Sequence, residues 1–188
     1  MTQVPAIHSA RLDLVSMSPA FPRASLEGWH AEAERLLGAA LPPDWPGDQA
    51  HWVRIRLDEI TVNPPAQPWL LRAMVLREPD RRLVGHTGFH DPPCPERTVE
   101  VGYTVLPEYR RRGYALEAVE ALFGWAGREH GIQRFLASVG PWNEPSLGLV
   151  RKMGFVQTGV RWDDEDGEEL VFELDRSART GVVHPPDR

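Results

Sequence analysis

The sequence predicts an α+β fold, in which helices and strands are distributed along one chain. Three observations support this class. Apolar residues recur at helical spacing in the first third, form strand-like runs in the middle, and alternate between both patterns toward the end. The length of 188 residues is typical of one domain, so we expect a single domain over residues 1–176.

The N-terminal third is predicted to be helical, with one strand leading into it. Residues 11–15 alternate in the manner of a short strand, which ends before Pro19. Residues 25–40 carry apolar side chains at helical spacing and predict one continuous helix that stops near Gly38. The proline-rich loop 41–48 follows. A second amphipathic helix, from Trp52 to Ile60, should end before the prolines that follow Asn63.

The middle of the chain changes to strand-like patterns. Apolar runs at residues 69–77 and 82–90 are separated by Glu-Pro-Asp-Arg, which predicts a hairpin. Residues 99–106 predict a third strand. The intervening segment 91–96 contains three prolines and cannot enter a sheet, so we expect a loop there.

The C-terminal part alternates between helices and strands. Apolar residues lie on one helical face from Gly113 to about His130, where Gly131 is a natural stop. The remaining elements are expected at 135–139 (strand), 143–153 (helix), 155–162 (strand) and 170–174 (strand). The acidic run 163–169 is most simply a solvated hairpin tip, with metal binding the alternative, and we expect residues 177–188 to form a disordered tail.

Charge and cysteine content exclude several classes of function. The 21 basic and 27 acidic residues give a net charge of −6, which disfavours general binding of nucleic acid or anionic membranes. Cys94 is the only cysteine, which excludes an intramolecular disulfide and any zinc site that needs two cysteines. The sequence shows no signal-peptide pattern and no run of about 20 apolar residues, so we expect a cytoplasmic protein.

A strand, a basic loop and a helix start follow one another in residues 99–118. Arg110, Arg111 and Arg112 precede Gly113, so three guanidinium groups lie beside the unpaired N–H groups at a helix N-terminus. Gly113 lets the backbone approach a ligand closely, and Ala115 keeps the next turn small. The pattern predicts an anion site that suits a pyrophosphate, although an exposed basic turn is the simpler alternative.

The arrangement Arg110-x-x-Gly113-x-Ala115 resembles the acetyl-CoA pyrophosphate loop of the GNAT N-acetyltransferase superfamily. Further matches follow in order: Glu100-x-Gly102-Tyr103, the segment 114–118, Asn143-x-x-Ser146 and the segment 152–155. These motifs are similar to the RimJ/RimL-like (ribosomal-protein-alanine acetyltransferase-like) branch, and the resemblance covers about residues 8–175.

The resemblance implies a mixed, mostly antiparallel central sheet flanked by helices, the acyl-CoA N-acyltransferase fold, in which two central strands splay apart around pantetheine. It implies acetyl-CoA as cosubstrate and no metal. In this sequence the pantetheine arm would follow Tyr103, Thr104 and Val105, and Asn143 would hydrogen-bond it unless it is only a helix N-cap. The expected phosphate contacts are Arg110, Arg111, Arg112, Gly113, Tyr114 and Ala115, with Lys152 as a weaker candidate.

Transfer of an acetyl group from a thioester to an amine benefits from a base and an acid. Glu100 is the best candidate for the base, because alternation places its side chain on the same strand face as Gly102 and Thr104, with a solvent-facing strand residue as the alternative. A backbone N–H near Val105 would hold the oxyanion.

Many relatives carry a tyrosine acid seven residues after the motif asparagine, but this chain has Val150 there. The resemblance suggests Ser146 as its substitute, unless Ser146 is only a helix-surface residue. His86 and His90 share a strand face near the site, where packed or exposed histidines are more common than catalytic ones.

Two functions from different classes follow. The first is transfer of an acetyl group from acetyl-CoA to a primary amine of a peptide N-terminus or a small molecule. The second is a non-catalytic acyl-CoA-binding regulatory module, which the absent tyrosine motivates. The sequence names no acceptor, predicts neither a nucleic-acid nor a membrane partner, and leaves a monomer and a homodimer open.

Overall fold

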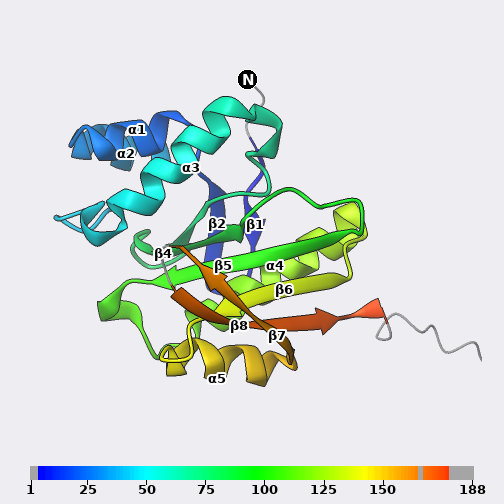
Figure 1. The fold of residues 1–188 in the computed structure, drawn as a ribbon. Helices are drawn as coiled ribbons and strands as arrows, with labels where there is room; N and C mark the ends of the chain where they lie inside the picture. The colour runs from blue at the N-terminus through cyan, green and yellow to red at the C-terminus, as the bar shows by residue number, and fades with distance from the viewer. Residues whose placement is uncertain (1–3, 165–166, 178–188) are drawn as a thin grey trace, which may run out of the picture.

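The computed structural model describes residues 4–164 and 167–177, which include one eight-stranded sheet of order β1-β2-β3-β4-β5-β6-β8-β7 (Figure 1). Neighbouring strands are antiparallel except for the parallel pair β5 and β6. The predicted α+β class, with a mixed and mostly antiparallel sheet, is confirmed. The strands are β1 (Ile7–His8), β2 (Leu12–Ser16), β3 (Arg72–Leu76), β4 (Leu83–Phe89), β5 (Thr98–Val105), β6 (Arg134–Val139), β7 (Val156–Asp163) and β8 (Gly167–Asp175).

Helices cover the sheet on both sides. In Figure 1, α1, α2 and α3 gather above the sheet, α4 lies behind β5 and β6, and α5 runs below β8. The largest hydrophobic cluster joins α4 and α5 to the sheet, and a second joins α1, α2 and α3 to β3. The helices are α1 (Ala20–Leu26), α2 (His30–Leu37), α3 (Ala50–Val62), α4 (Tyr114–His130) and α5 (Glu144–Met153), with short 3-10 turns η1 (Gly47–Gln49), η2 (Pro64–Ala66) and η3 (Pro107–Tyr109).

The prediction of one helix over residues 25–40 is wrong, because the segment belongs to two helices, α1 and α2. Gly28 follows α1 with φ of 74°, in the left-handed region. The Gly28 N–H donates to the Ser25 carbonyl, and the Trp29 N–H donates to the Ala24 carbonyl at 2.9 Å. This is the hydrogen-bond pattern of a Schellman helix end. Apolar spacing continues across the break because both helices bury one face against the same cluster.

The remaining predicted elements are confirmed with boundary shifts of a few residues. β3 and β4 form the predicted hairpin, α3 ends before Pro64, and Gly131 ends α4 in the left-handed conformation. β1 was not predicted, because two residues are too few to show alternation. The predicted tail lies almost entirely in residues 178–188, outside the described residues.

The parallel pair β5 and β6 separates partway along its length. The two strands pair only from Thr98 with Arg134 to Glu100 with Leu136. Beyond Glu100, β5 continues to pair with β4 as far as Val105, whereas β6 continues beside β8 as far as Val139. The sheet therefore opens between β5 and β6, as the family resemblance implies.

Candidate active site

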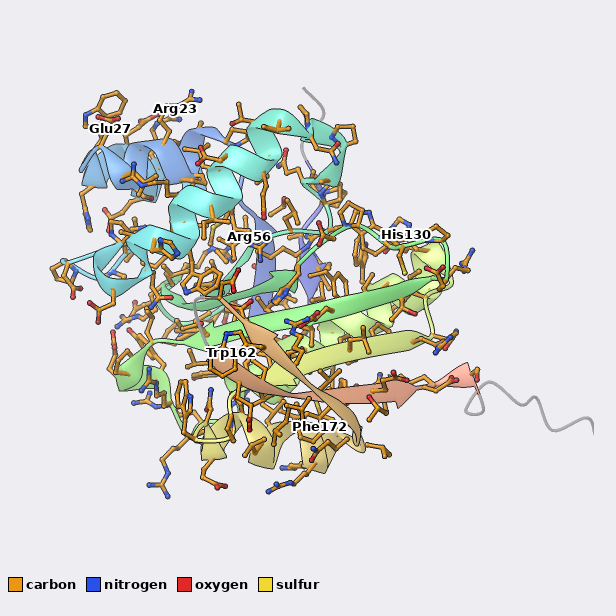
Figure 2. The ribbon with its side chains drawn as sticks, viewed as in Figure 1. Arg23, Glu27, Arg56, His130, Trp162 and Phe172 are labelled. Carbon is orange, nitrogen blue, oxygen red and sulfur yellow. The ribbon has the colours of Figure 1, made fainter. Side chains whose placement is uncertain are left out.

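A cavity of about 260 Å³ lies where β5 and β6 separate. Its lining comes mainly from β4, β5, β6 and the start of α5, with Glu169 of β8 and two residues of α3, Trp52 and Arg56. Figure 2 shows Arg56 on the side of α3 that faces the sheet. Since ligand pockets are commonly 300–1,000 Å³, this cavity suits the reactive end of a large ligand rather than a whole one.

The cavity reaches both faces of the sheet. His86 pairs with Thr104 and Gly88 pairs with Gly102, so these residues share the face that α3 covers. Tyr103 belongs to the opposite face, where it packs against the core of α4 and α5, and the cavity lining on that side includes Asn143 and Ser146 of α5. The opening between β5 and β6 therefore connects the two faces.

The separation leaves backbone groups of β5 unpaired on the side of the opening. The carbonyl groups of Glu100 and Gly102 point toward β4, where they accept hydrogen bonds from the His90 N–H and the Thr87 hydroxyl. Because backbone direction alternates along a strand, the N–H and carbonyl groups of Val101 and Tyr103 face the opening. An extended ligand with amide groups can pair with them as a strand would.

The basic loop after β5 ends at the N-terminus of α4. Arg111 and Gly113 both have positive φ, 61° and 81°, and none of the described side chains caps the helix start at Gly113. The first-turn N–H groups of α4 therefore point outward beside the three exposed arginines. Arg110 also donates to the Val105 carbonyl at 3.0 Å, which ties the loop to the end of β5.

Arg11 holds this loop in place, a role that the sequence did not reveal. Its guanidinium donates to Glu117 at 2.6 Å and to the Arg112 carbonyl at 3.1 Å, and it lies over the Tyr114 ring. Burial acts to raise the pKa of Glu117, but hydrogen bonds from Ser9 and Arg11 outweigh it and hold that pKa below its usual value. Residues about one hundred positions apart thus fix the start of α4.

Asn143 caps α5, because its side-chain oxygen accepts the Ser146 N–H at 3.2 Å. Both residues line the cavity, so a capping role and a ligand-binding role are compatible. Lys152 lies near the other end of α5, about 13 Å along the helix axis from Asn143. The structure does not bring Lys152 to the cavity.

Two buried hydroxyl groups in the cavity lining, those of Tyr103 and Ser138, have no hydrogen-bond partner within the part of the chain that the structure describes. Leaving such a group unpaired costs about 1–3 kcal/mol, so it demands an explanation. Burial raises the pKa of the Tyr103 phenol, and the nearby Ser146 side chain acts in the opposite direction. Tyr103 therefore keeps its proton at neutral pH.

Glu100 is bound in a network that joins β5 to β7 and β8. Its two carboxylate oxygens each accept a hydrogen bond of 2.9 Å from Arg161, which also donates to Glu169 at 2.8 Å. Figure 1 shows β7 crossing in front of β8 toward β5, which brings Arg161 within reach. Glu169 lines the cavity, whereas Glu100 is not among the described lining residues.

His90 connects Glu100 to the cavity. Its Nδ1 lies 3.7 Å from Glu100, and its ring occupies space that a Cβ at Gly102 would otherwise fill, since that Cβ would lie 2.9 Å from Nε2. Burial lowers the pKa of His90. Arg56 and Arg161 act in the same direction, and Glu100 and Asp91 oppose them. The imidazole is therefore neutral at physiological pH and can accept a proton.

His86 lines the same cavity but is bound more tightly. Its Nε2 lies 2.8 Å from the Gln49 side-chain oxygen, so the neutral ring donates there. Burial, helped by Arg56, lowers the pKa of His86 to about 4. This ring is a weak base at neutral pH, and its Nε2 is already bound to Gln49.

The structure brings most of the predicted site residues together. The cavity is lined by Tyr103, Thr104, Asn143 and Ser146, and the loop 110–115 follows the end of β5. Glu100 does not line the cavity itself but lies 3.7 Å from His90, which does. The sequence missed Arg161, Ser138, Glu169 and Trp142. Trp142 directly precedes Asn143 and could have been noticed, but the others depend on strand register.

Within ranges 4–164 and 167–177, no group of three His, Cys, Asp or Glu side chains is arranged to hold a metal ion. In the same ranges, no helix combines the length and apolar character that crossing a membrane requires.

Curated relatives match part of the chain. YoaA of Bacillus subtilis (strain 168), described as an uncharacterized N-acetyltransferase, is 34% identical over 90 residues, which are 48% of this chain and 51% of YoaA. YjdG of the same organism, described in the same words, is 26% identical over 125 residues, 66% of this chain and 74% of YjdG. The matched segment thus spans about half the length of YoaA.

Solved structures share the whole fold. A putative ribosomal-protein-serine acetyltransferase from Vibrio cholerae superposes with a TM-score of 0.65 at 19% identity, covering 93% of this chain and 99% of that one. RimL, a ribosomal L7/L12 α-N-protein acetyltransferase in complex with coenzyme A, gives 0.63 at 16% identity, covering 92% and 99%. The family model for the acetyltransferase (GNAT) domain matches residues 11–156, and this match, together with the opened sheet and its loop, shows that the chain belongs to the GNAT acetyltransferase family.

Proposed function

We propose that this protein transfers the acetyl group of acetyl-CoA to a primary amine. The observation that carries the proposal is the cavity at the β5–β6 opening, which reaches both faces of the sheet, with a basic helix start following β5 in the chain. Such a passage lets a thioester enter from one face and an amine from the other.

In this proposal acetyl-CoA binds along β5. Its pantetheine amides pair with the open backbone of Val101 and Tyr103, and Asn143 offers its side-chain amide from the start of α5. The phosphates lie on the first-turn N–H groups of α4, with Arg110, Arg111, Arg112, Gly113, Tyr114 and Ala115 as the contacts. The Val105 N–H is the candidate donor to the oxyanion.

The attacking amine must lose a proton. The Glu100 carboxylate is the predicted base, but both of its oxygens accept hydrogen bonds from Arg161. We therefore assign the direct contact with the amine to His90, which lines the cavity. Glu100, 3.7 Å from Nδ1, stabilises the imidazolium that forms. Glu100 then acts as a positioning and electrostatic residue.

The acceptor class is a peptide N-terminus or a small-molecule amine. RimL acts on a protein α-amine by its own description, and its fold superposes along 92% of this chain, which supports the first class. Trp52 of α3 and Trp142 before α5 line the cavity and offer apolar surface to an acceptor side chain.

A thiol-release assay tests the proposal. Acetyl-CoA is mixed with the protein and with a panel of N-terminal peptides, polyamines and aminoglycosides, and free CoA is measured with a thiol reagent. Acceptor-dependent release, with an acetylated product of the expected mass, supports the enzyme. Tight CoA binding with no release from any acceptor supports the second candidate, a non-catalytic acyl-CoA-binding module, which Val150 in place of the usual tyrosine favours.

A further inference from the structure

The hydroxyl group of Tyr103 is buried at the cavity, where the Ser146 side chain lies near it but no described residue makes a hydrogen bond with it. Tyrosine hydroxyls in protein interiors are normally paired, since an unpaired one gives up its hydrogen bonds to water without replacement. A phenylalanine at this position would avoid the cost. The hydroxyl therefore points to a partner that arrives with the ligand.

The Tyr103 hydroxyl lies on the side of the cavity where we expect the sulfur of acetyl-CoA. Tyr103 projects from β5 toward α5, on the cavity side lined by Asn143 and Ser146. Val150, which stands where many relatives carry a tyrosine, is only 1% exposed and belongs to the core. The helix therefore offers no phenol to the cavity, but the neighbouring strand does.

We propose that the Tyr103 hydroxyl donates the proton to the thiolate that leaves acetyl-CoA, so that a strand tyrosine supplies the acid that α5 lacks. This assignment rests on the proposed acetyl transfer. It replaces Ser146 as the candidate acid. Ser146 stays a neighbour of the phenol on the cavity wall.

The proton and electron balance of the step is simple. The amine nitrogen forms a bond to the thioester carbon with its lone pair, and the carbonyl electrons move to oxygen. Their return breaks the C–S bond, whose electron pair leaves on sulfur while the phenol O–H gives its proton to that sulfur. The amine proton passes to His90, which then releases it to solvent while the phenolate takes one proton back from solvent, so the enzyme is restored and the products are an amide and CoA with a free thiol.

Tyr103 is chemically better suited to this step than Ser146. A phenol ordinarily has a pKa near 10, whereas an aliphatic hydroxyl is a far weaker acid. Burial raises the pKa of Tyr103, but the same loss of water raises the proton affinity of a thiolate expelled beside it. The phenol stays protonated until sulfur becomes negative.

The first experiment is Tyr103→Phe, which removes only the unpaired oxygen. We expect kcat to fall about 10²-fold, while KM for acetyl-CoA changes less than about two-fold. Because no hydrogen bond is lost on removal of this oxygen, the thermal midpoint should not fall. Tyr109→Phe is the matched control, since the Tyr109 ring packs beside the core from η3 and should leave kcat unchanged.

Normal kcat in folded Tyr103→Phe, together with a large loss in Ser146→Ala, would overturn the assignment in favour of Ser146. A loss confined to KM would also overturn it, because it would show a binding contact rather than proton donation.

A second experiment does not depend on turnover. CoA and desulfo-CoA, which lacks the sulfur, are titrated calorimetrically into the wild type and Tyr103→Phe. If the phenol contacts sulfur, Tyr103→Phe binds CoA several-fold more weakly and desulfo-CoA as well as the wild type does. Equal affinity of both proteins for CoA would overturn the contact, even if no acceptor supported turnover and the proposed acetyl transfer itself had failed.

Discussion

Glu100 and Arg161 are joined by two hydrogen bonds of 2.9 Å, which connect β5 to β7 across the intervening strands β6 and β8. Arg161 continues to Glu169, which lines the cavity. Glu100 also lies 3.7 Å from His90. A carboxylate held in this way is rigid, and its charge acts on the cavity through the imidazole.

We expect Glu100→Gln to lower turnover about 10²-fold while hardly changing acetyl-CoA binding. Glutamine keeps the size and one oxygen for Arg161, but it removes the charge that stabilises protonated His90. The loss should shrink as pH rises, because an acceptor amine that is already deprotonated needs less help. Steady-state rates at pH 7 and pH 9, with calorimetric acetyl-CoA affinity, provide the measurement.

Glu27→Gln is the control for this substitution, because Glu27 lies at the end of α1, away from the cavity (Figure 2). Near-normal turnover of Glu100→Gln at pH 7 would mean that Glu100 only joins the strands and that the base lies elsewhere.

The pH profile of kcat/KM should report the protonation of the His90 imidazole. Its pKa lies below the usual 6.5, because burial and the charges of Arg56 and Arg161 outweigh Glu100 and Asp91. Activity should therefore fall on the acid side, below pH 6.5, as the imidazole gains a proton. Since Glu100 raises the pKa of His90, Glu100→Gln should move this acid limb to still lower pH.

His90→Gln should lower kcat and remove the acid limb attributed to the imidazole. An unchanged limb in folded His90→Gln protein would assign the titration to another group.

Acetyl-CoA affinity should depend on the loop before α4. Gly113→Val forces a β-branched residue to a φ of 81°, at a cost of about 1–3 kcal/mol, and obstructs the helix start. Arg110→Ala removes the proposed phosphate contact and the hydrogen bond to the Val105 carbonyl. Each should weaken CoA binding in calorimetry without unfolding the domain, and dephospho-CoA distinguishes contacts with the ribose phosphate.

Gly148→Ala is the control for the glycine substitution. Gly148 lies in α5, and apart from its neighbours and the backbone of its own helix no described atom lies within 4 Å of an added Cβ, so alanine should keep CoA affinity and stabilise the helix slightly. Wild-type affinity in folded Gly113→Val would reject the loop as the phosphate site.

His86 should make the fold sensitive to acid. Its pKa is about 4 in the folded protein and 6.5 when unperturbed, so the unfolded chain binds the extra proton between these values. Stability from neutral His86 is complete above pH 6.5 and is lost as pH falls toward 4, by up to about 3 kcal/mol. Denaturant titrations at several pH values measure this.

In His86→Asn, the free energy of unfolding should fall less over the same pH interval, because no imidazole remains to be protonated. An equal fall in wild type and variant would place the acid sensitivity in other groups.

The sequence predicted an element correctly wherever a single helix or strand buries one apolar face against the core. α4 follows from its apolar spacing and from Gly131, and the cap at Asn143 follows from its position before an apolar helix. Local spacing failed at Gly28, because two helices that pack on one cluster show the same apolar spacing as one helix. Trp142 adjoins a predicted site residue, yet no periodic pattern marks it.

The sequence by itself determined the α+β class, the order of nearly all strands and helices, and the basic loop before α4, because each depends on residues near one another in the chain. Only the tertiary structure decided which groups meet at the cavity. Arg161 reaches Glu100 across two strands, and Arg11 reaches Glu117 from the residue before β2. Strand register and the separation of β5 from β6 set these contacts, and both arise from packing between distant segments, which no local spacing encodes.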